Sequence, residues 1–376
     1  TLEEDPLFQK ENGTGPFQVE KWDRAEKEIV FEKFEGYWRE PASLEKVRIR
    51  SVTEWSTRLL KLKAGDADYI ATPVEFLDEV SDLEGVKIER GLGMVCTTNM
   101  FFAWPVVEKG NPAIGSGKLD GNGIPPDFFS NQDVRKAFSY SMNYDALLNQ
   151  VLLDQTQQAH GPMVEGIMGW REDQPVYSYN PEKAEEYFKK AYGGELWEKG
   201  FELTSYYITG LTNWQSSLRI LQQSLARINP KFELKIQGLQ WSKFSDYLWG
   251  REAPVMPLSV CNWGPDYSDP GGPLGAATYY LSSDGLIASF SGEGYQSLME
   301  KEFDPLLEKA FSLTDPQERE EIYAQLQSMS LEKATTLFMY EDFAYAVTRD
   351  WVHGHVHNPM TYGAWYFYPI SKGESS

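Results

Sequence analysis

The feature that most constrains the fold is a regular succession of strand-like and helix-like segments in the second half of the chain. Continuous apolar runs alternate there with stretches whose apolar side chains recur every three or four residues. The expected order is strand 201–208, helix 214–228, strand 232–236, helix 241–249 and strand 255–260. Strands joined through helices of this length pair in parallel. The helix brings the chain back to the end of the sheet where the previous strand began, so the next strand runs in the same direction. The sequence therefore predicts an α/β domain on a parallel sheet.

The first half of the chain predicts a separate α/β region. A hairpin is expected over 17–22 and 28–32, and a strand–helix–strand unit over 46–70, with the helix ending at Gly65. The Gly161-Pro162 pair reads as a lobe boundary. We therefore expect a first lobe of residues 1–158 plus 346–376 and a second lobe of residues 159–345, each a mixed sheet flanked by helices.

A Gly- and Pro-rich stretch from about residue 105 to 130 separates two of the expected elements. It shows no helix or strand periodicity over its first twenty residues. Long segments of this kind inside compact domains are commonly functional or mobile loops. We expect an inserted surface loop here, followed by a helix that is capped at Asn131 or Ser130 and extends through Val151.

The charge of the chain excludes several partners. With 376 residues, a formal charge of −21 and a pI near 4.7, the protein would be repelled by nucleic acid and by anionic membranes. Aromatic residues reach 14% and many lie in expected loops, which favours a ring-lined binding cleft. Two cysteines, Cys96 and Cys261, form neither a disulfide scaffold nor a zinc motif, and the sequence leaves open whether they pair.

No catalytic or cofactor motif is present in the sequence. There is no G-x-S-x-G elbow, and the Gly-Ser-Gly-Lys stretch at 115–118 lacks the spacing of a phosphate-binding loop. The calcium-like start at Asp120 has Ile124 where a third oxygen ligand is needed. We therefore predict a protein that is not an enzyme and that holds no cofactor or resident metal.

Two alternatives remain open at this point. His353, His355 and His357 would share one face of a strand, and imidazole suits zinc, copper or nickel, so a metal chelate is an alternative ligand. A hydrolase that uses Asp266 and Asp269 as acid and base is a third possibility.

The stretch from Trp263 to Pro270 is the strongest candidate for a binding site. It follows the expected strand over 255–260, and ligands of α/β proteins collect beyond the carboxyl ends of such strands. A carboxylate at Asp266, between the rings of Trp263 and Tyr267, would favour a compact cation such as an amine. The bland alternative is a Pro-rich turn in which Asp266 and Asp269 bond to their own backbone.

Several motifs, in this order, resemble the bacterial extracellular solute-binding protein family 5, the oligopeptide- and dipeptide-binding proteins of ABC importers. The motifs are Gly-Thr-Gly-Pro-Phe at 13–17, Tyr-Trp at 37–38, Ala-Gly-Asp-Ala-Asp-Tyr at 64–69, the Val-Arg-Lys-Ala helix at 134–137 with Asn143 where Asp is usual, Gly-Pro at 161–162, Tyr-Asn-Pro-Glu-Lys-Ala at 179–184 and Trp263 with Asp266-Tyr267.

The resemblance implies a two-lobed periplasmic-binding-protein-like (type II) clamp that closes on a small peptide. It implies that Asp266 takes the α-ammonium group of the peptide beside Trp263 and Tyr267, and that Asn99 and Tyr340 lie near the peptide backbone. It further implies an exported, periplasmic or cell-surface lipoprotein that acts as a monomer and delivers its ligand to membrane permease subunits.

The chain departs from the family pattern at its start. Only twelve residues precede Gly13, whereas family members carry an export signal and a substantial N-terminal portion there. We therefore expect a fragment that lacks the N-terminal side of its first lobe.

Overall fold

The computed structural model describes residues 11–250, 254–271, 275–361 and 365–373. Two compact units make up the chain: unit 1 is residues 1–92 with 344–376, and unit 2 is residues 93–343. The boundary falls near residue 93, whereas the sequence placed it at residue 159. Gly161-Pro162 instead lies inside unit 2, where the Met163 N–H donates to the side chain of Gln327 at 2.9 Å.

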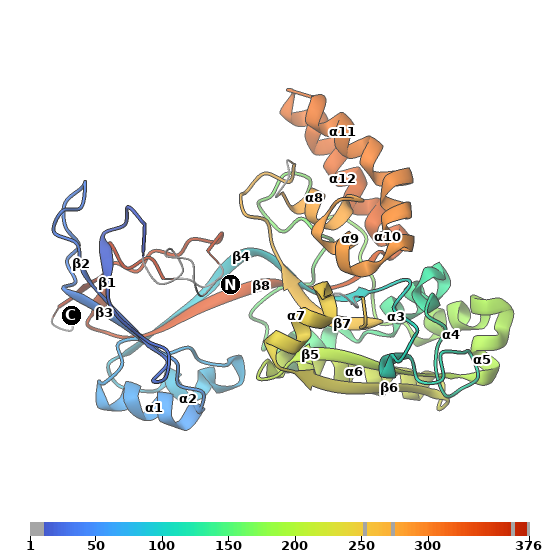
Figure 1. Cartoon of the computed structure of the whole chain (residues 1–376), viewed down its shortest axis with the longest axis horizontal. Helices are drawn as coiled ribbons and strands as arrows, with labels where there is room; N and C mark the ends of the chain where they lie inside the picture. Colours follow the sequence, from blue (N-terminus) through green and yellow to red (C-terminus); the bar gives the residue numbers. More distant parts are fainter. Residues whose placement is uncertain (1–10, 251–253, 272–274, 362–364, 374–376) are drawn as a thin grey trace. The chain divides into compact units, whose positions relative to one another are not determined.

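Unit 1 is built on a three-stranded antiparallel sheet in the order β1-β2-β3 (Figure 1). The predicted hairpin and the predicted helix are confirmed, the helix ending at Gly65 with a φ of 76°. Its elements are β1 (Phe17–Asp23), β2 (Glu28–Lys33), β3 (Lys46–Arg50), α1 (Trp55–Ala64), η2 (Val74–Phe76), α2 (Leu77–Ser81), β9 (Val352–His353) and β10 (Ser371–Lys372).

The expected strand–helix–strand unit over 46–70 is wrong. β3 pairs antiparallel with β2, and the segment after α1 forms only an isolated bridge between Tyr69 and Thr348. Tyr69 packs on the ring of Trp365 with 4.2 Å between centroids. The alternation of apolar residues after α1 thus serves packing against the C-terminal part of the chain.

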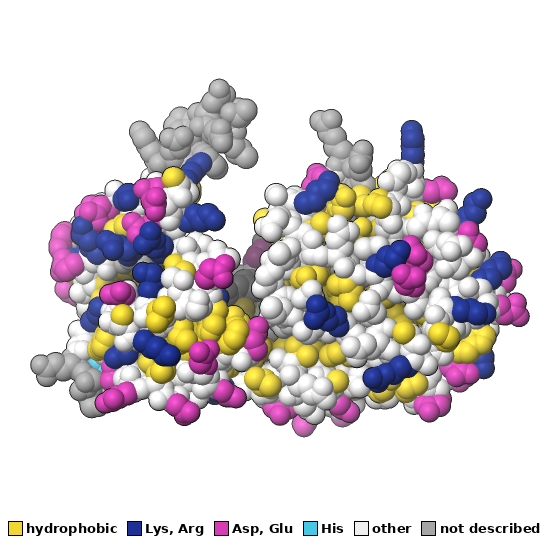
Figure 2. Space-filling model, turned by 90° about the horizontal axis from the view of Figure 1, so that it is seen from below, with side chains coloured by type: hydrophobic (Ala, Val, Ile, Leu, Met, Phe, Trp, Pro, Cys, Tyr) yellow, Lys and Arg dark blue, Asp and Glu magenta, His cyan; other side chains and the backbone are white. Residues whose placement is uncertain are grey.

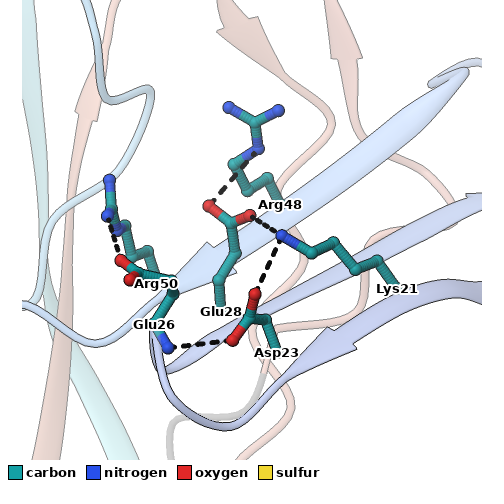
Figure 3. Close-up of polar contacts among 6 residues, drawn as sticks. All are labelled: Lys21, Asp23, Glu26, Glu28, Arg48 and Arg50. Carbon is teal, nitrogen blue, oxygen red and sulfur yellow. Dashed lines mark hydrogen bonds and ion pairs between the residues drawn. The ribbon is translucent and has the colours of Figure 1, made fainter.

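Opposite charges face one another across the three-stranded sheet (Figure 3). Lys21 of β1 lies 3.1 Å from Asp23 and 3.6 Å from Glu28 of β2, which also lies 3.8 Å from Arg48 of β3. The hydrogen bond with Asp23 is the main cause that raises the pKa of Lys21. Figure 2 likewise shows acidic and basic side chains interspersed, as expected for the solvated surface of an acidic protein.

Unit 2 contains a five-stranded mixed sheet in the order β6-β5-β7-β4-β8. The strands are β4 (Val86–Phe102), β5 (Phe201–Ile208), β6 (Phe232–Leu239), β7 (Leu258–Trp263) and β8 (Thr336–Arg349). β5 runs parallel to both β6 and β7, as predicted, and β4 runs antiparallel to β7. β4 begins in unit 1, and β8 ends there.

Helices surround this sheet (Figure 1). Predicted caps are confirmed at Asn131, Asn180 and Asp315, whose side chains accept backbone N–H groups of the first turn. The helical elements are η3 (Pro112–Ile114), η4 (Phe128–Ser130), α3 (Gln132–Ser141), η5 (Ala146–Val151), α4 (Pro181–Lys190), η6 (Ala191–Gly194), α5 (Glu195–Lys199), α6 (Thr212–Ile228), α7 (Trp241–Trp249), α8 (Ala276–Leu281), α9 (Leu286–Ser291), α10 (Glu293–Leu298), η7 (Met299–Phe303), α11 (Asp304–Ser312) and α12 (Pro316–Lys333).

The helix expected over 131–151 is interrupted. α3 ends at Ser141 because Met142 is extended, with a ψ of 123°, and a separate helical turn, η5, begins at Ala146. The Asn143 side chain accepts the N–H of Ala146 at the start of this turn. Of the apolar residues predicted to face inward, Val134, Phe138, Met142 and Leu147 are buried, whereas Leu148 and Val151 are half-buried. The apolar pattern was therefore largely correct, but the helix is not continuous.

The segment 105–130 is anchored in the core at several points, although most of its residues are exposed or half-buried, as expected for a surface segment. Asn111 fastens it by donating to the backbone carbonyls of Val107 and Val255, each at 2.8 Å. Phe128 and Phe129 at its end are completely buried against Phe138 of α3. Side-chain-to-backbone hydrogen bonds and two consecutive buried aromatic residues thus anchor this segment. Neither feature produces a periodic sequence pattern, so periodicity did not reveal the anchoring.

Arg135 of α3 is a buried guanidinium at the centre of unit 2, 3% exposed and 3.9 Å from the ring centre of Trp104. It donates to four backbone carbonyls, those of Phe129, Ser130, Lys333 and Ala334. Burial lowers the pKa of this guanidinium to about 9, so it remains charged at neutral pH. Arg135 therefore ties α3 to the end of η4 and to the end of α12.

Candidate functional site

The candidate site lies on unit 2, at the edge where the parallel strands β5, β6 and β7 end. Ile208, Leu239 and Trp263 are the last residues of these strands. The carboxyl ends of parallel strands are the usual position of ligand sites in α/β folds. α7 follows β6 and brings Trp249 to this edge, where its ring contacts Trp263 with 5.9 Å between centroids.

The predicted site residues Trp263, Asp266 and Tyr267 lie at the end of β7 and in the loop after it. Trp263 is partly buried, whereas Asp266 is exposed. The Tyr267 hydroxyl donates to the Gly271 carbonyl at 2.8 Å, which fixes the turn. A ligand role for these three side chains stays a prediction.

Asp269, the second carboxylate of this loop, is held by an ion pair. Both its oxygens accept from one guanidinium nitrogen of Arg319, at 2.9 and 3.1 Å, and one oxygen also accepts the Gly271 N–H. The carboxylate is thereby committed to shaping the loop and binding α12. This arrangement argues against the hydrolase hypothesis, in which Asp266 and Asp269 act as acid and base.

A largely buried carboxylate that no sequence motif indicated lies next to the end of β7. Asp342 of β8 accepts from the hydroxyl of Thr98 on β4 at 2.7 Å, and from the side-chain amide of Asn262 on β7 at 2.9 Å. Burial raises the pKa of Asp342 in spite of these hydrogen bonds. One sequence signal could have identified this residue: strand alternation places Asp342 on the same face as Tyr340.

Tyr340, a predicted site residue, lies completely buried in the same group of side chains. Its hydroxyl accepts from the side-chain amide of Asn213 in the first turn of α6, at 3.0 Å. Burial raises the pKa of this hydroxyl, and the Asp342 carboxylate raises it further. Tyr340 is therefore a neutral hydrogen-bonding group that joins β8 to the helix after β5.

Asn99, another predicted site residue, lies on the other face of β4 from Thr98, since side chains alternate along a strand. It is completely buried, and its side-chain amide donates to the hydroxyls of Thr97 and Tyr280, at 2.8 and 3.0 Å. Its Oδ1 atom has no hydrogen-bond partner among the described residues. A contact between Asn99 and a ligand stays a prediction.

Both cysteines are free thiols in the structure, and both are buried. Burial, with a further contribution from the neighbouring Asp342 carboxylate, raises the pKa of Cys96. Burial also raises the pKa of Cys261 to about 12. Thiols that resist ionisation in this way are poor nucleophiles and poor metal ligands.

The three histidines do not form the uniform strand face on which a metal site would depend. β9 ends at His353, and Gly354 turns the chain with a φ of 79°. His355 instead lies 2.8 Å from Glu89 and packs on the ring of Trp365. Within the described ranges, no group of three or more His, Cys, Asp or Glu side chains could hold a metal ion.

In the part of the chain that the structure describes, no helix combines the length and the apolar character needed to cross a bilayer.

Comparison with known proteins identifies relatives over nearly the whole chain. The probable D,D-dipeptide-binding periplasmic protein DdpA of Escherichia coli (strain K12) is 24% identical over 356 residues, covering 94% of this chain and 61% of that protein. The dipeptide-binding protein of the same organism is 22% identical over 352 residues, covering 93% of this chain and 59% of that protein. The chain thus spans less than two thirds of the length of these curated relatives.

Solved structures share the fold. DppA from Helicobacter pylori in complex with the peptide STSA matches with a TM-score of 0.75 and 20% identity, over 96% of this chain and 63% of that one. NikA from Staphylococcus aureus in complex with Ni(L-His)2 matches with a TM-score of 0.72 and 16% identity, over 95% of this chain and 68% of that one. These likenesses confirm the predicted α/β fold of the two-lobed periplasmic-binding-protein class.

The family itself follows from a sequence model. The model described as bacterial extracellular solute-binding proteins, family 5 Middle, matches residues 3–283. Since this match extends over well over half of the chain, the protein belongs to the bacterial extracellular solute-binding proteins of family 5.

Proposed function

We propose that this chain is the larger part of an extracytoplasmic receptor that binds small peptides for an ABC importer. Membership of a family of solute-binding proteins is the observation that carries the proposal. Among its relatives are proteins named for the binding of dipeptides. The receptor would be exported, possess no catalytic function and pass its peptide to permease subunits in the membrane.

In this proposal Asp266 accepts the α-ammonium group of the peptide, with Trp263 and Tyr267 beside it. The supporting arrangement is an exposed carboxylate on the loop that leaves the carboxyl end of β7. The neighbouring Asp269 is neutralised by Arg319, so it does not compete for the ligand cation. Asn99 and Tyr340 would lie near the backbone of the bound peptide.

Calorimetry on the full-length protein tests this assignment with short peptides, free and N-acetylated. Asp266→Asn should weaken the binding of free peptides by about tenfold or more, since a hydrogen bond to a charged group contributes about 1.5–3 kcal/mol. Binding of acetylated peptides should not change. Asp284→Asn, which removes an equally exposed carboxylate of unit 2, is the matched control. Equal affinity of the wild type for both peptide forms would exclude the ammonium role of Asp266.

A further inference from the structure

Asp342 is a largely buried charge of unit 2 whose hydrogen-bond donors are all neutral. One oxygen accepts from the Thr98 hydroxyl, the other accepts from the Asn262 amide, and the Cys96 thiol lies beside the carboxylate as a further neutral donor. A carboxylate offers about four acceptor positions, so at least one position remains for another donor. Among the described residues, no Lys, Arg or His side chain contributes to the shift in the pKa of Asp342.

The structural role of Asp342 does not need a negative charge. An asparagine at this position could accept from Asn262 and donate to the Thr98 hydroxyl, because a hydroxyl both donates and accepts. Burying a charged carboxylate costs desolvation free energy that a neutral side chain bridging the same strands would avoid. Charges retained in spite of this cost are typical of functional sites. The alternative is a purely structural role, in which Asp342 only joins β4, β7 and β8 by hydrogen bonds.

The position of Asp342 favours a role in ligand binding over a purely structural role. Asn262, its partner, directly precedes Trp263 at the carboxyl end of β7. As a residue Asp342 is largely but not completely buried, whereas Thr98 is completely buried. A donor group that arrives at this edge would approach Asp342 from its exposed side. The complement of a half-desolvated carboxylate is a cation that carries N–H donors, because such pairs form short and strong hydrogen bonds.

We propose that Asp342 is a specificity-determining residue that binds the ammonium or guanidinium group of a basic side chain in the peptide. The inference rests on the proposed peptide-binding function and adds a preference to it. Asp266 and Asp342 would then serve two different cations, the peptide terminus and a lysine- or arginine-type side chain. The net charge of −21 would favour the approach of such cationic peptides at low ionic strength.

The test compares tripeptides that carry lysine or norleucine at the first, second or third position and alanine elsewhere. Norleucine keeps the aliphatic side chain and lacks the ammonium group. Calorimetry on the full-length protein should show that lysine binds about tenfold or more tightly than norleucine at one position, as expected for a charge-assisted hydrogen bond. Asp342→Asn should abolish this preference and leave norleucine affinity within about twofold. Asp284→Asn should preserve the preference.

Each outcome has one meaning. Binding of neither peptide series by the wild type would overturn the proposed peptide receptor and this inference with it. Binding of both series with equal affinity, or a lysine preference that persists in Asp342→Asn, would overturn the basic-side-chain site alone. Asp342→Ser serves as a second neutral variant, and thermal unfolding of both variants shows whether they are folded.

Discussion

Arg135 and Asp342 are both charged side chains held within unit 2, and the protein surrounds them in opposite ways. The guanidinium of Arg135 has four backbone carbonyls and an indole ring around it. The carboxylate of Asp342 has neutral side-chain donors alone, on Thr98, Asn262 and Cys96. The fold supplies the Arg135 guanidinium with a full set of acceptors, whereas the Asp342 carboxylate keeps hydrogen-bonding capacity for a further partner.

This difference separates structural charges from functional ones. A buried charge with a complete set of partners stabilises the elements that supply them, and its loss leaves those partners unpaired. A buried charge with an incomplete set lowers stability, and such features concentrate where proteins bind or react. Mutations at the two residues should therefore affect different measurements, stability for Arg135 and ligand preference for Asp342.

The largest expected effect is the loss of stability in Arg135→Met. Methionine fills similar apolar space but leaves the carbonyls at the ends of η4 and α12 without their donor. A buried acceptor left unpaired costs about 1–3 kcal/mol, so we expect a loss of at least about 3 kcal/mol in the free energy of unfolding. Urea unfolding of the purified variant measures it.

Arg135→Lys is the control that keeps the charge. One ammonium group cannot reach carbonyls on both η4 and α12, because Lys lacks the planar fork of Arg. An intermediate loss of stability is expected. Wild-type stability in Arg135→Met would contradict the structural role given to this residue.

Glu341, the neighbour of Asp342 on β8, gives a second comparison because it faces the other way. Its carboxylate accepts from the Trp170 indole N–H at 3.1 Å, and from the Glu165 N–H at 3.2 and 3.3 Å. Glu341→Leu should lower the free energy of unfolding by about 2–3 kcal/mol, since it leaves both donors unpaired. Glu341→Gln, which still offers an acceptor, should lose less. Equal stability of the two variants by denaturant unfolding would show that these hydrogen bonds contribute little.

The elements of unit 2 were largely predictable from the sequence because its periodic segments are long and well capped. The alternation over 201–263 predicted three parallel strands, and Asn180 and Asp315 cap helices as expected. The anchoring of the segment 105–130 in the core was not predicted because side-chain-to-backbone bonds such as those of Asn111 leave no periodic pattern. Pairing of β3 with β2 rather than with a strand after α1 depends on tertiary contacts, which local propensity does not encode.

The site was predictable only where residues are close in sequence. Trp263, Asp266 and Tyr267 stand together in one loop, so a single stretch of sequence brought them to notice. Thr98, Asn262 and Asp342 are each separated by many residues and meet only when β4, β7 and β8 assemble. Strand register decides such meetings, and register follows from the whole sheet.

The smallest expected effect concerns the pH dependence that Asp342 imposes on stability. Because burial raises the pKa of Asp342 in the folded state above its unfolded value, the folded state binds the proton more tightly. The stabilising contribution of the proton is complete below the unfolded pKa and is lost as pH rises through the folded pKa. The stability of the wild type relative to Asp342→Asn should therefore increase as pH falls from neutral towards about 4. Denaturant unfolding of both proteins over this range measures the difference. A difference that does not change with pH would mean that Asp342 is no more desolvated than an ordinary surface carboxylate, and its contrast with Arg135 would then disappear.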